Sequence, residues 1–170
     1  MVFMTYDLAG VDIPVYNGLI DFEFRVLDQS DVERYLEFRR DTTLATVEQR
    51  LEQGHRCFAA LHSGELVDVC WAAVGSVHVD YLNYDLALDD SDIYSFDSFT
   101  APEYRGKGAY MARNSWQARL NQSEGFARSV ALVAYENYAA WLILSRSGLK
   151  SAGTHHYIRI PGMRIRWQTS

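Results

Sequence analysis

The sequence has few cysteines, no long apolar run and no excess of basic residues. Cys57 and Cys70 are the only cysteines, without the spacing of a metal site or a disulfide framework, so both are expected to be small buried side chains in a reducing compartment. A formal charge of −6 argues against a nucleic-acid binder, because neutralising phosphates requires a basic surface. A transmembrane helix or signal peptide needs a sustained apolar run, which is missing. We therefore expect a soluble, cytoplasmic protein that binds neither nucleic acid nor membrane.

Proline is also rare, with three in 170 residues, and no Pro/Gly/Ser-rich linker divides the chain. This length suits one well-buried domain. Residues 1 to 20 carry Gly10, Pro14 and Gly18 at short intervals, which predicts a loosely packed N-terminal lead-in or one short edge strand. The expected organisation is this lead-in followed by a single domain over residues 21 to 170.

Hydrophobic periodicity divides the chain into strands and helices. Alternating Phe22, Phe24 and Val26 predict a half-buried strand, and helices are expected where apolar residues recur every three or four positions. The expected strands cover about residues 21–26, 56–61, 65–79, 92–100, 129–135, 155–160 and 163–167, and the expected helices cover about 31–40, 43–53, 109–123 and 138–147. Residues 78 to 92 extend the hairpin or form a loop. The order predicts an α/β (α+β) fold with a mixed, mostly antiparallel sheet and helices on both faces.

One junction in this series combines a strand, a turn and a glycine-rich helix start. The strand 92–100 is rich in β-branched and aromatic residues, Pro102 marks the turn, and good helix formers begin at Ala109. Gly106 and Gly108 leave the backbone uncovered, so amides of the first helical turn can point at an anion, aided by the helix dipole. The glycine spacing fits neither a Walker loop nor a dinucleotide fingerprint.

The segment Pro102-x-x-Arg105-Gly-Lys-Gly108 resembles the R-x-x-G-x-G/A signature of the GNAT superfamily of N-acetyltransferases, which binds the pyrophosphate of coenzyme A. The pattern departs at its last position, where Tyr110 replaces Gly or Ala. Its side chain either crowds the pyrophosphate or points away. Without a cofactor, the segment is an ordinary helix start after a proline turn.

A second motif of the same family occurs further along the chain. Asn137 precedes Ala140 by three residues, and the helix ends in Ser147-Gly148-Leu149, which resembles N-x-x-A followed by a Gly-aromatic pair, with Leu149 in place of the aromatic residue. The resemblance covers roughly residues 21 to 167. It implies a GNAT-like acyl-CoA N-acyltransferase fold and acetyl-CoA as the acyl donor.

The resemblance also implies which residues contact the cofactor. In the family, two parallel strands part, and their unpaired backbone groups hold the pantetheine, while a backbone amide near Phe99 polarises the thioester carbonyl. Asn137 either reaches the pantetheine or caps its helix. The implied cofactor-binding residues are Ser98, Phe99, Thr100, Arg105, Gly106, Lys107, Gly108, Ala109, Tyr110 and Asn137.

Two carboxylates compete for the role of general base. Asp92 is the first choice, because it lies thirteen residues before Arg105, the position of a catalytic Glu in histone-type members of the family. Asp97 lies in an apolar strand, where a carboxylate needs a partner or an elevated pKa. The two point to opposite faces unless a bulge intervenes. Both also have a structural interpretation, as a strand-end cap or a hydrogen-bonded side chain.

The family pattern fails at the residue that protonates the departing thiolate. Many members place a Tyr seven residues after the motif Asn, and this chain has Leu144 there. Either a nearby hydroxyl substitutes, with Tyr138, Tyr135 and Ser145 nearest in sequence, or the thiolate leaves unaided. Because the pKa of a thiol is about 8.5, unaided departure is chemically tolerable.

The acidic, tyrosine-rich segment 80–97 precedes the cofactor strand, where the family builds part of its acceptor site. Acid and aromatic side chains suit a cationic amine, either a small molecule or a protein amine, and they also suit a solvated hairpin edge. Within the same fold, the alternative is transfer of a longer acyl chain, from acyl-CoA or an acyl-carrier protein. A different class is a non-catalytic acyl-CoA-binding module.

Two further features complete the sequence-based expectations. His155 and His156 are adjacent in a strand and point to opposite faces, so no metal site is expected. The aromatic-rich C-terminal hairpin is a surface through which a homodimer can form, although the sequence does not establish one.

Overall fold

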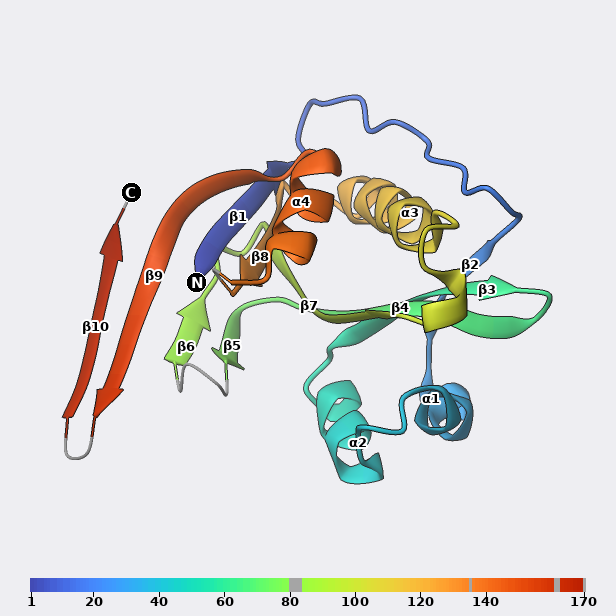
Figure 1. The fold of residues 1–170 in the computed structure, drawn as a ribbon, viewed down its shortest axis with the longest axis horizontal. Helices are drawn as coiled ribbons and strands as arrows, with labels where there is room; N and C mark the ends of the chain where they lie inside the picture. Colours follow the sequence, from blue (N-terminus) through green and yellow to red (C-terminus); the bar gives the residue numbers. More distant parts are fainter. Residues whose placement is uncertain (80–83, 135, 161–162, 170) are drawn as a thin grey trace.

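The computed structural model describes residues 1–79, 84–134, 136–160 and 163–169. Its centre is a sheet of eight strands in the order β10-β9-β1-β8-β7-β4-β3-β2 (Figure 1). The strands are β1 (Val2–Asp7), β2 (Glu23–Leu27), β3 (Arg56–His62), β4 (Glu65–Ala73), β7 (Asp92–Thr100), β8 (Arg128–Val133), β9 (Lys150–Ile160) and β10 (Met163–Thr169). The described neighbours pair antiparallel except for β7 and β8, which are parallel. The sheet is therefore mixed and mostly antiparallel, as predicted.

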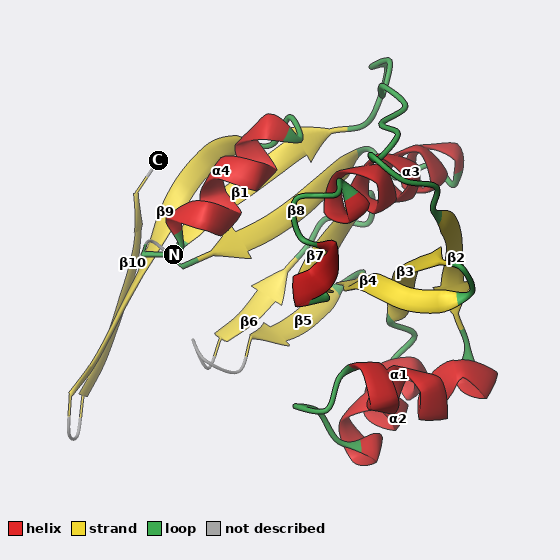
Figure 2. Ribbon diagram, turned by 45° about the vertical axis from the view of Figure 1, so that its right-hand side comes forward, coloured by secondary structure: helices red, strands yellow, loops and turns green. Residues whose placement is uncertain are grey.

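Helices cover both faces of this sheet, which confirms the predicted fold class. Figure 2 shows α1 (Val32–Phe38) and α2 (Leu44–Glu52) below it, with α3 (Ala109–Ser123) and α4 (Tyr138–Arg146) above it. Short 3-10 turns precede α1 and α3. No helix within the described ranges combines the length and apolar character needed to cross a bilayer.

The alternation along β3 shows why the sheet is buried on both faces. Cys57 and Ala59 belong to an apolar cluster between the sheet and helices α1 and α2, whereas Phe58 packs on the other face against Trp116 of α3. All three β3 side chains are at most 1% exposed. Side chains that alternate between two faces thus meet a helix on each side, which explains the continuous apolar run of this strand.

The first strand corrects the expectation for the N-terminal segment. β1 is neither loose nor at an edge, because it pairs with β8 on one side and β9 on the other. Met4 is fully buried beneath α4, and Phe3 packs on the opposite face. The chain then crosses α3, where the Tyr16 amide donates to Ser115 Oγ at 3.1 Å and the Leu19 amide donates to Lys107 O at 2.8 Å (Figure 1). The sheet therefore begins at residue 2.

The stretch that the sequence left open forms a separate two-stranded ribbon. The expected long strand 65–79 breaks after β4 at Gly75, whose φ of 74° lies in the left-handed region. The ribbon consists of β5 (Ser76–Val79) and β6 (Tyr84–Ala87), which pair antiparallel. Its apolar face, with Val77 and Leu86, packs on the same side of the sheet as α2. The ribbon and α2 thus flank the middle of β7, at Tyr94, Phe96 and Asp97.

Candidate functional site

The parallel strands β7 and β8 part in the middle of the sheet. They pair from Asp92 to Ser95 of β7, and within the described part of the chain no further pair joins them beyond Ser95. The cause is a bulge against β4: Trp71 faces Phe96, but Val69 faces Phe99, so β7 carries one extra residue. Asp97 lies in this bulge with a φ of 48°, a conformation that Asp tolerates better than most residues. The bulge thus opens a gap in which the facing backbone edges of β7 and β8 no longer pair with each other.

A cavity of about 610 Å³ occupies this gap, and we call it the inter-strand cavity. Its walls come from the end of β7, from β8, from the start of α3 and from α4. The sequence-predicted residues that line it are Asp97, Ser98, Phe99, Thr100, Arg105, Tyr110 and Asn137. Segments far apart in the sequence therefore meet here, while Gly106 to Gly108 form the adjoining turn and Ala109 begins α3.

The turn before α3 depends on its two glycines. Gly106 and Gly108 have φ angles of 76° and 92°, and Gly108 is the N-cap. The first bond of the helix runs from the Ala112 amide to Gly108 O at 2.9 Å, so the amides just before it have no partner within the helix. A Cβ at position 108 would lie 2.9 Å from the Cα of Gly18 in the crossing N-terminal segment. Both backbone conformation and close packing thus require glycine, at a helix end suited to an anion.

Two cations flank this turn, and neither forms an ion pair with a carboxylate of the described residues. Arg105 is exposed, donates from Nε to Thr100 O at 3.2 Å, and lies 6.0 Å from the ring centre of Phe99. Lys107 Nζ lies 4.8 Å from the ring centre of Tyr104. Both charges therefore remain available to a ligand phosphate.

Tyr110, the departure from the motif, lines the inter-strand cavity instead of pointing away. Its ring centre lies 5.1 Å from the guanidinium carbon of Arg113, and burial raises the pKa of the Tyr110 hydroxyl. The hydroxyl is therefore protonated at neutral pH.

A buried ion pair supports the floor of the same cavity, and the motifs did not predict it. Arg113 Nε donates to Asp68 Oδ1 at 2.6 Å, and both side chains are completely buried. Arg113 also donates to Ser98 Oγ at 3.0 Å and to Gln117 Oε1 at 2.6 Å. The available signal was the spacing of Arg113, Gln117 and Asn121, a polar stripe on α3 that faces the sheet. The pair holds Ser98 in place behind the gap.

Asn137 caps α4 and lies in the wall of the inter-strand cavity, whereas Tyr138 points elsewhere. Asn137 Oδ1 accepts from the Ala140 amide at 3.1 Å, which caps α4, and the residue also lines the cavity. Tyr138 is 67% exposed and stacks on Trp141 outside the cavity lining. Leu144 lines the cavity at the family Tyr position, and Tyr135 lies outside the described residues.

Asp92, the first choice for the base, is held in an ion pair at the other end of β7. Its carboxylate accepts from Arg128 Nε at 2.8 Å and from Arg128 Nη2 at 2.6 Å, and the residue is 3% exposed. It lines neither this cavity nor the second one described below. The geometry therefore favours the structural role for Asp92.

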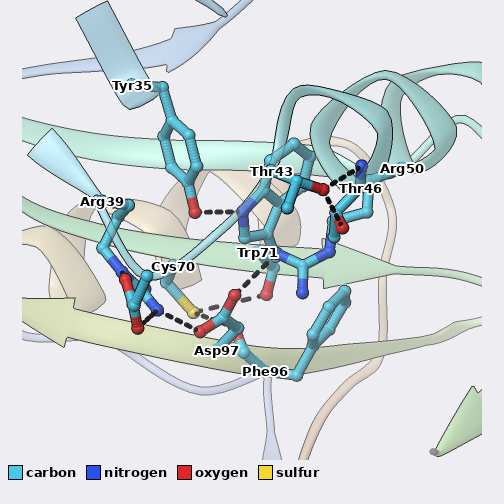
Figure 3. A network of polar contacts seen from close by, with 10 residues as sticks. Tyr35, Arg39, Thr43, Thr46, Arg50, Cys70, Trp71, Phe96 and Asp97 are labelled. Atoms are coloured by element: carbon cyan, nitrogen blue, oxygen red, sulfur yellow. Dashed lines mark hydrogen bonds and ion pairs between the residues drawn. The ribbon is translucent and has the colours of Figure 1, made fainter. Parts of the chain in front are cut away.

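Asp97 lies at the gap, between two arginines (Figure 3). Its carboxylate accepts from Arg39 Nη2 at 3.0 Å and from Arg50 Nη1 at 2.6 Å. The Arg50 guanidinium also lies over the rings of Trp71 and Phe96, at 5.1 and 5.2 Å from their centres. Both carboxylate oxygens are thus occupied, so Asp97 positions two arginines more readily than it accepts a proton.

The other side of this network is deeply buried. Trp71 Nε1 donates to the Tyr35 hydroxyl at 2.7 Å, and the two rings meet edge to face (Figure 3). Burial raises the pKa of Tyr35 to about 12, so its hydroxyl stays protonated. The bond from Trp71 to Tyr35 of α1 thus fixes the Trp71 ring on which the guanidinium group of Arg50 lies.

A second cavity, of about 770 Å³, lies between α2, the β5–β6 ribbon and β7, and we call it the α2 cavity. It shares Phe96, Asp97 and Leu132 with the inter-strand cavity. The residues that line it are Thr46, Gln49, Arg50, Gln53, His55, Val74, Ser76, Val77, His78, Val79, Asp85, Tyr94, Phe96, Asp97 and Leu132. The two cavities therefore meet at the bulge of β7.

The expected acidic, aromatic segment contributes to this second cavity only in part. Asp85, Tyr94 and Asp97 line it, but Asp85 is paired with His78 Nδ1 at 2.6 Å and Asp97 with two arginines. Residues 80–83 lie outside the described residues. Arg50 and His55 were missed, because no motif marks residues that only tertiary packing brings to β7.

Comparison with known proteins agrees with this architecture. No family model and no curated protein matches the sequence. Among solved structures, the aminoglycoside N-acetyltransferase AAC(6')-Iy, in complex with a CoA-acetylneamine bisubstrate analogue, is similar with a TM-score of 0.66 and 16% identity, covering 83% of this chain and 99% of that chain. An acetyltransferase of Trypanosoma brucei is similar with a TM-score of 0.56 and 18% identity, covering 82% of this chain and 100% of that chain.

An N-acetyltransferase from Staphylococcus aureus Mu50 is also similar, with a TM-score of 0.61 and 14% identity, covering 81% of this chain and 88% of that chain. At such identities the likeness shows the fold alone. It confirms the fold that the two motifs implied.

Proposed function

We propose that this chain, which has the fold of the GNAT acetyltransferases, transfers an acetyl group from acetyl-CoA to a primary amine of a small-molecule acceptor by direct attack on the thioester. One observation carries the proposal: two cavities meet at the bulge of β7, one beginning at a glycine-rich helix start and the other walled by α2 and the ribbon. Such an arrangement brings two substrates together at one point.

The inter-strand cavity fits an acyl-CoA. The free backbone edges beside Ser98 to Thr100 and along β8 would hold the pantetheine as an added strand does. The amides before Ala112, with Arg105 and Lys107, would hold the pyrophosphate. Support also comes from AAC(6')-Iy, which was solved in complex with CoA. Acetyl-CoA supplies the activated acyl group as a thioester.

The chain's own residues then assist the transfer without a dedicated acid. A backbone amide near Phe99 polarises the carbonyl that is attacked. Leu144 offers no proton where the family has Tyr, so the thiolate departs unaided, which its pKa of about 8.5 permits. Tyr138, exposed on α4, takes no part in this scheme.

The α2 cavity is the proposed acceptor site. Its volume suits a small molecule, and the ring of Tyr94 offers one face for an ammonium group. Solved relatives of the fold include an aminoglycoside acetyltransferase in complex with sisomicin. Because Arg50 lies beside Asp97, the site favours an acceptor with few positive charges over a polycation.

The direct test is amine-dependent release of coenzyme A thiol from acetyl-CoA, with sisomicin, glucosamine, spermidine and a peptide N-terminus as acceptors. Mass spectrometry should find one acetyl group on an accepted amine. Turnover only with longer acyl-CoA or acyl-carrier-protein donors would correct the donor. Absence of turnover with every donor, despite acetyl-CoA binding, would contradict the proposal in favour of a non-catalytic module.

A further inference from the structure

His55 is fixed at the wall of the α2 cavity by the end of α2. The helix closes at Gly54, whose φ is 76°, and the His55 amide donates to Arg50 O at 2.9 Å. The imidazole then meets Phe96 edge on, with ring centres 5.6 Å apart. Phe96 lines both cavities, so His55 packs against a residue of the wall that the two cavities share.

The surroundings of this imidazole favour its neutral form. Nδ1 is buried and has no hydrogen-bond partner among the described residues. No carboxylate or carbonyl of these residues therefore stabilises the imidazolium form through a hydrogen bond from Nδ1. Burial, and secondarily the charge of Arg50, lower the pKa of His55. With Nδ1 enclosed, Nε2 is the nitrogen through which the ring can take a proton from the cavity.

The other ionisable groups around this cavity are engaged. Arg50 of α2 is a cation and accepts no proton. Asp97 of β7 is bound by two guanidinium groups, and Asp85 of the ribbon is paired with His78. His55 thus lines the cavity as a base whose imidazole forms no ion pair or hydrogen bond with the described residues.

We infer that His55 is the general base of the proposed acetyl transfer, an assignment that rests on that function. The acceptor ammonium gives a proton to Nε2, directly or through one water. The freed amine lone pair forms the C–N bond, and the C–S bond breaks with its electrons on sulfur. The surplus proton on the new amide nitrogen then passes to the thiolate, which yields the amide, free coenzyme A and an imidazolium.

The test compares His55→Gln with His62→Gln, using the best amine of the panel above. His62 is a suitable control because it lies at the far end of β3, bonded to Asp21 O and outside both cavities. We expect His55→Gln to lower kcat/KM at least about a hundredfold and to remove the acid limb of the pH profile. Acetyl-CoA affinity should not change. His62→Gln should match the wild type.

An NMR titration of the imidazole signals provides a readout that is independent of turnover. The signal absent in His55→Gln should titrate below the ordinary His value of about 6.5. A titration at or above that value, or an unchanged acid limb in an active His55→Gln, overturns this inference alone. A wild type that transfers no acetyl group to any amine defeats the proposed function, and this assignment with it.

Discussion

The inter-strand cavity and the α2 cavity adjoin at Asp97 but are built in different ways. The first combines backbone groups, namely a bulge, an unpaired strand edge and the amides of a helix start, with mostly apolar side chains of β8 and α4. The second uses side chains from α2, β7 and the ribbon, held by ion pairs such as Arg50–Asp97. This contrast agrees with the proposal that the first cavity holds a common cofactor and the second a variable acceptor. Changes on each side should therefore affect different quantities.

The largest expected effect comes from breaking the buried support of the inter-strand cavity. Arg113→Met removes one partner of a completely buried pair and leaves Asp68 as an uncompensated charge. We expect the free energy of unfolding to fall by about 3–5 kcal/mol in urea titrations. Arg40→Met, at an exposed position of the same residue type, should change it by less than about 0.5 kcal/mol. A loss below about 1 kcal/mol for Arg113→Met would contradict the account.

The second prediction separates the two carboxylates of β7. Asp97→Asn keeps the left-handed backbone but removes the charge that holds Arg39 and Arg50. We expect the KM for the amine to rise about tenfold, equivalent to about 1.4 kcal/mol, with acetyl-CoA affinity unchanged. Steady-state kinetics and calorimetry measure the two quantities.

Asp92→Asn is the matched control for that experiment. Because Asp92 is paired with Arg128 outside both cavities, its variant should lose stability and retain turnover. Loss of turnover in a folded Asp92→Asn would restore Asp92 as the candidate base.

The smallest effect should come from Asn137, which belongs to the helix and the cavity at once. Asn137→Ala removes the cap of α4 and should cost about 1 kcal/mol of stability in thermal or urea unfolding. Asn137→Asp retains a cap oxygen but not the amide donor. If it binds acetyl-CoA as the wild type does, Asn137 only caps the helix, and weaker binding shows that the amide also serves the cofactor.

The features that were predictable from sequence are those that the local chain determines. The alternation of strands, the proline turn and the two glycines follow from backbone geometry, so the fold and the junction before α3 were predicted correctly. β1 was not, because six residues carry little periodic signal and their place between β8 and β9 depends on distant partners.

The catalytic side chains could not be assigned from sequence, because their surroundings also depend on partners that are distant in the chain. Spacing placed Asp92 and Asp97 on one strand, but only tertiary structure shows that Arg128 engages the first and that a bulge sets the second between two arginines. Likewise, Tyr138 is near the missing family Tyr in sequence, yet its position on α4 turns it to solvent. Sequence distance did not decide which groups share a cavity.

The most direct test of the central claim is calorimetric titration of the protein with acetyl-CoA. Gly108→Trp should abolish binding, because a side chain there collides with Gly18 and displaces the turn that presents the amides. Gly125→Trp is the matched control, with a similar φ of 93° and nothing within 4 Å of its added Cβ at the other end of α3. The account predicts saturable binding by the wild type and the control, and none by Gly108→Trp. No binding by the wild type, or undiminished binding by a folded Gly108→Trp, would contradict it.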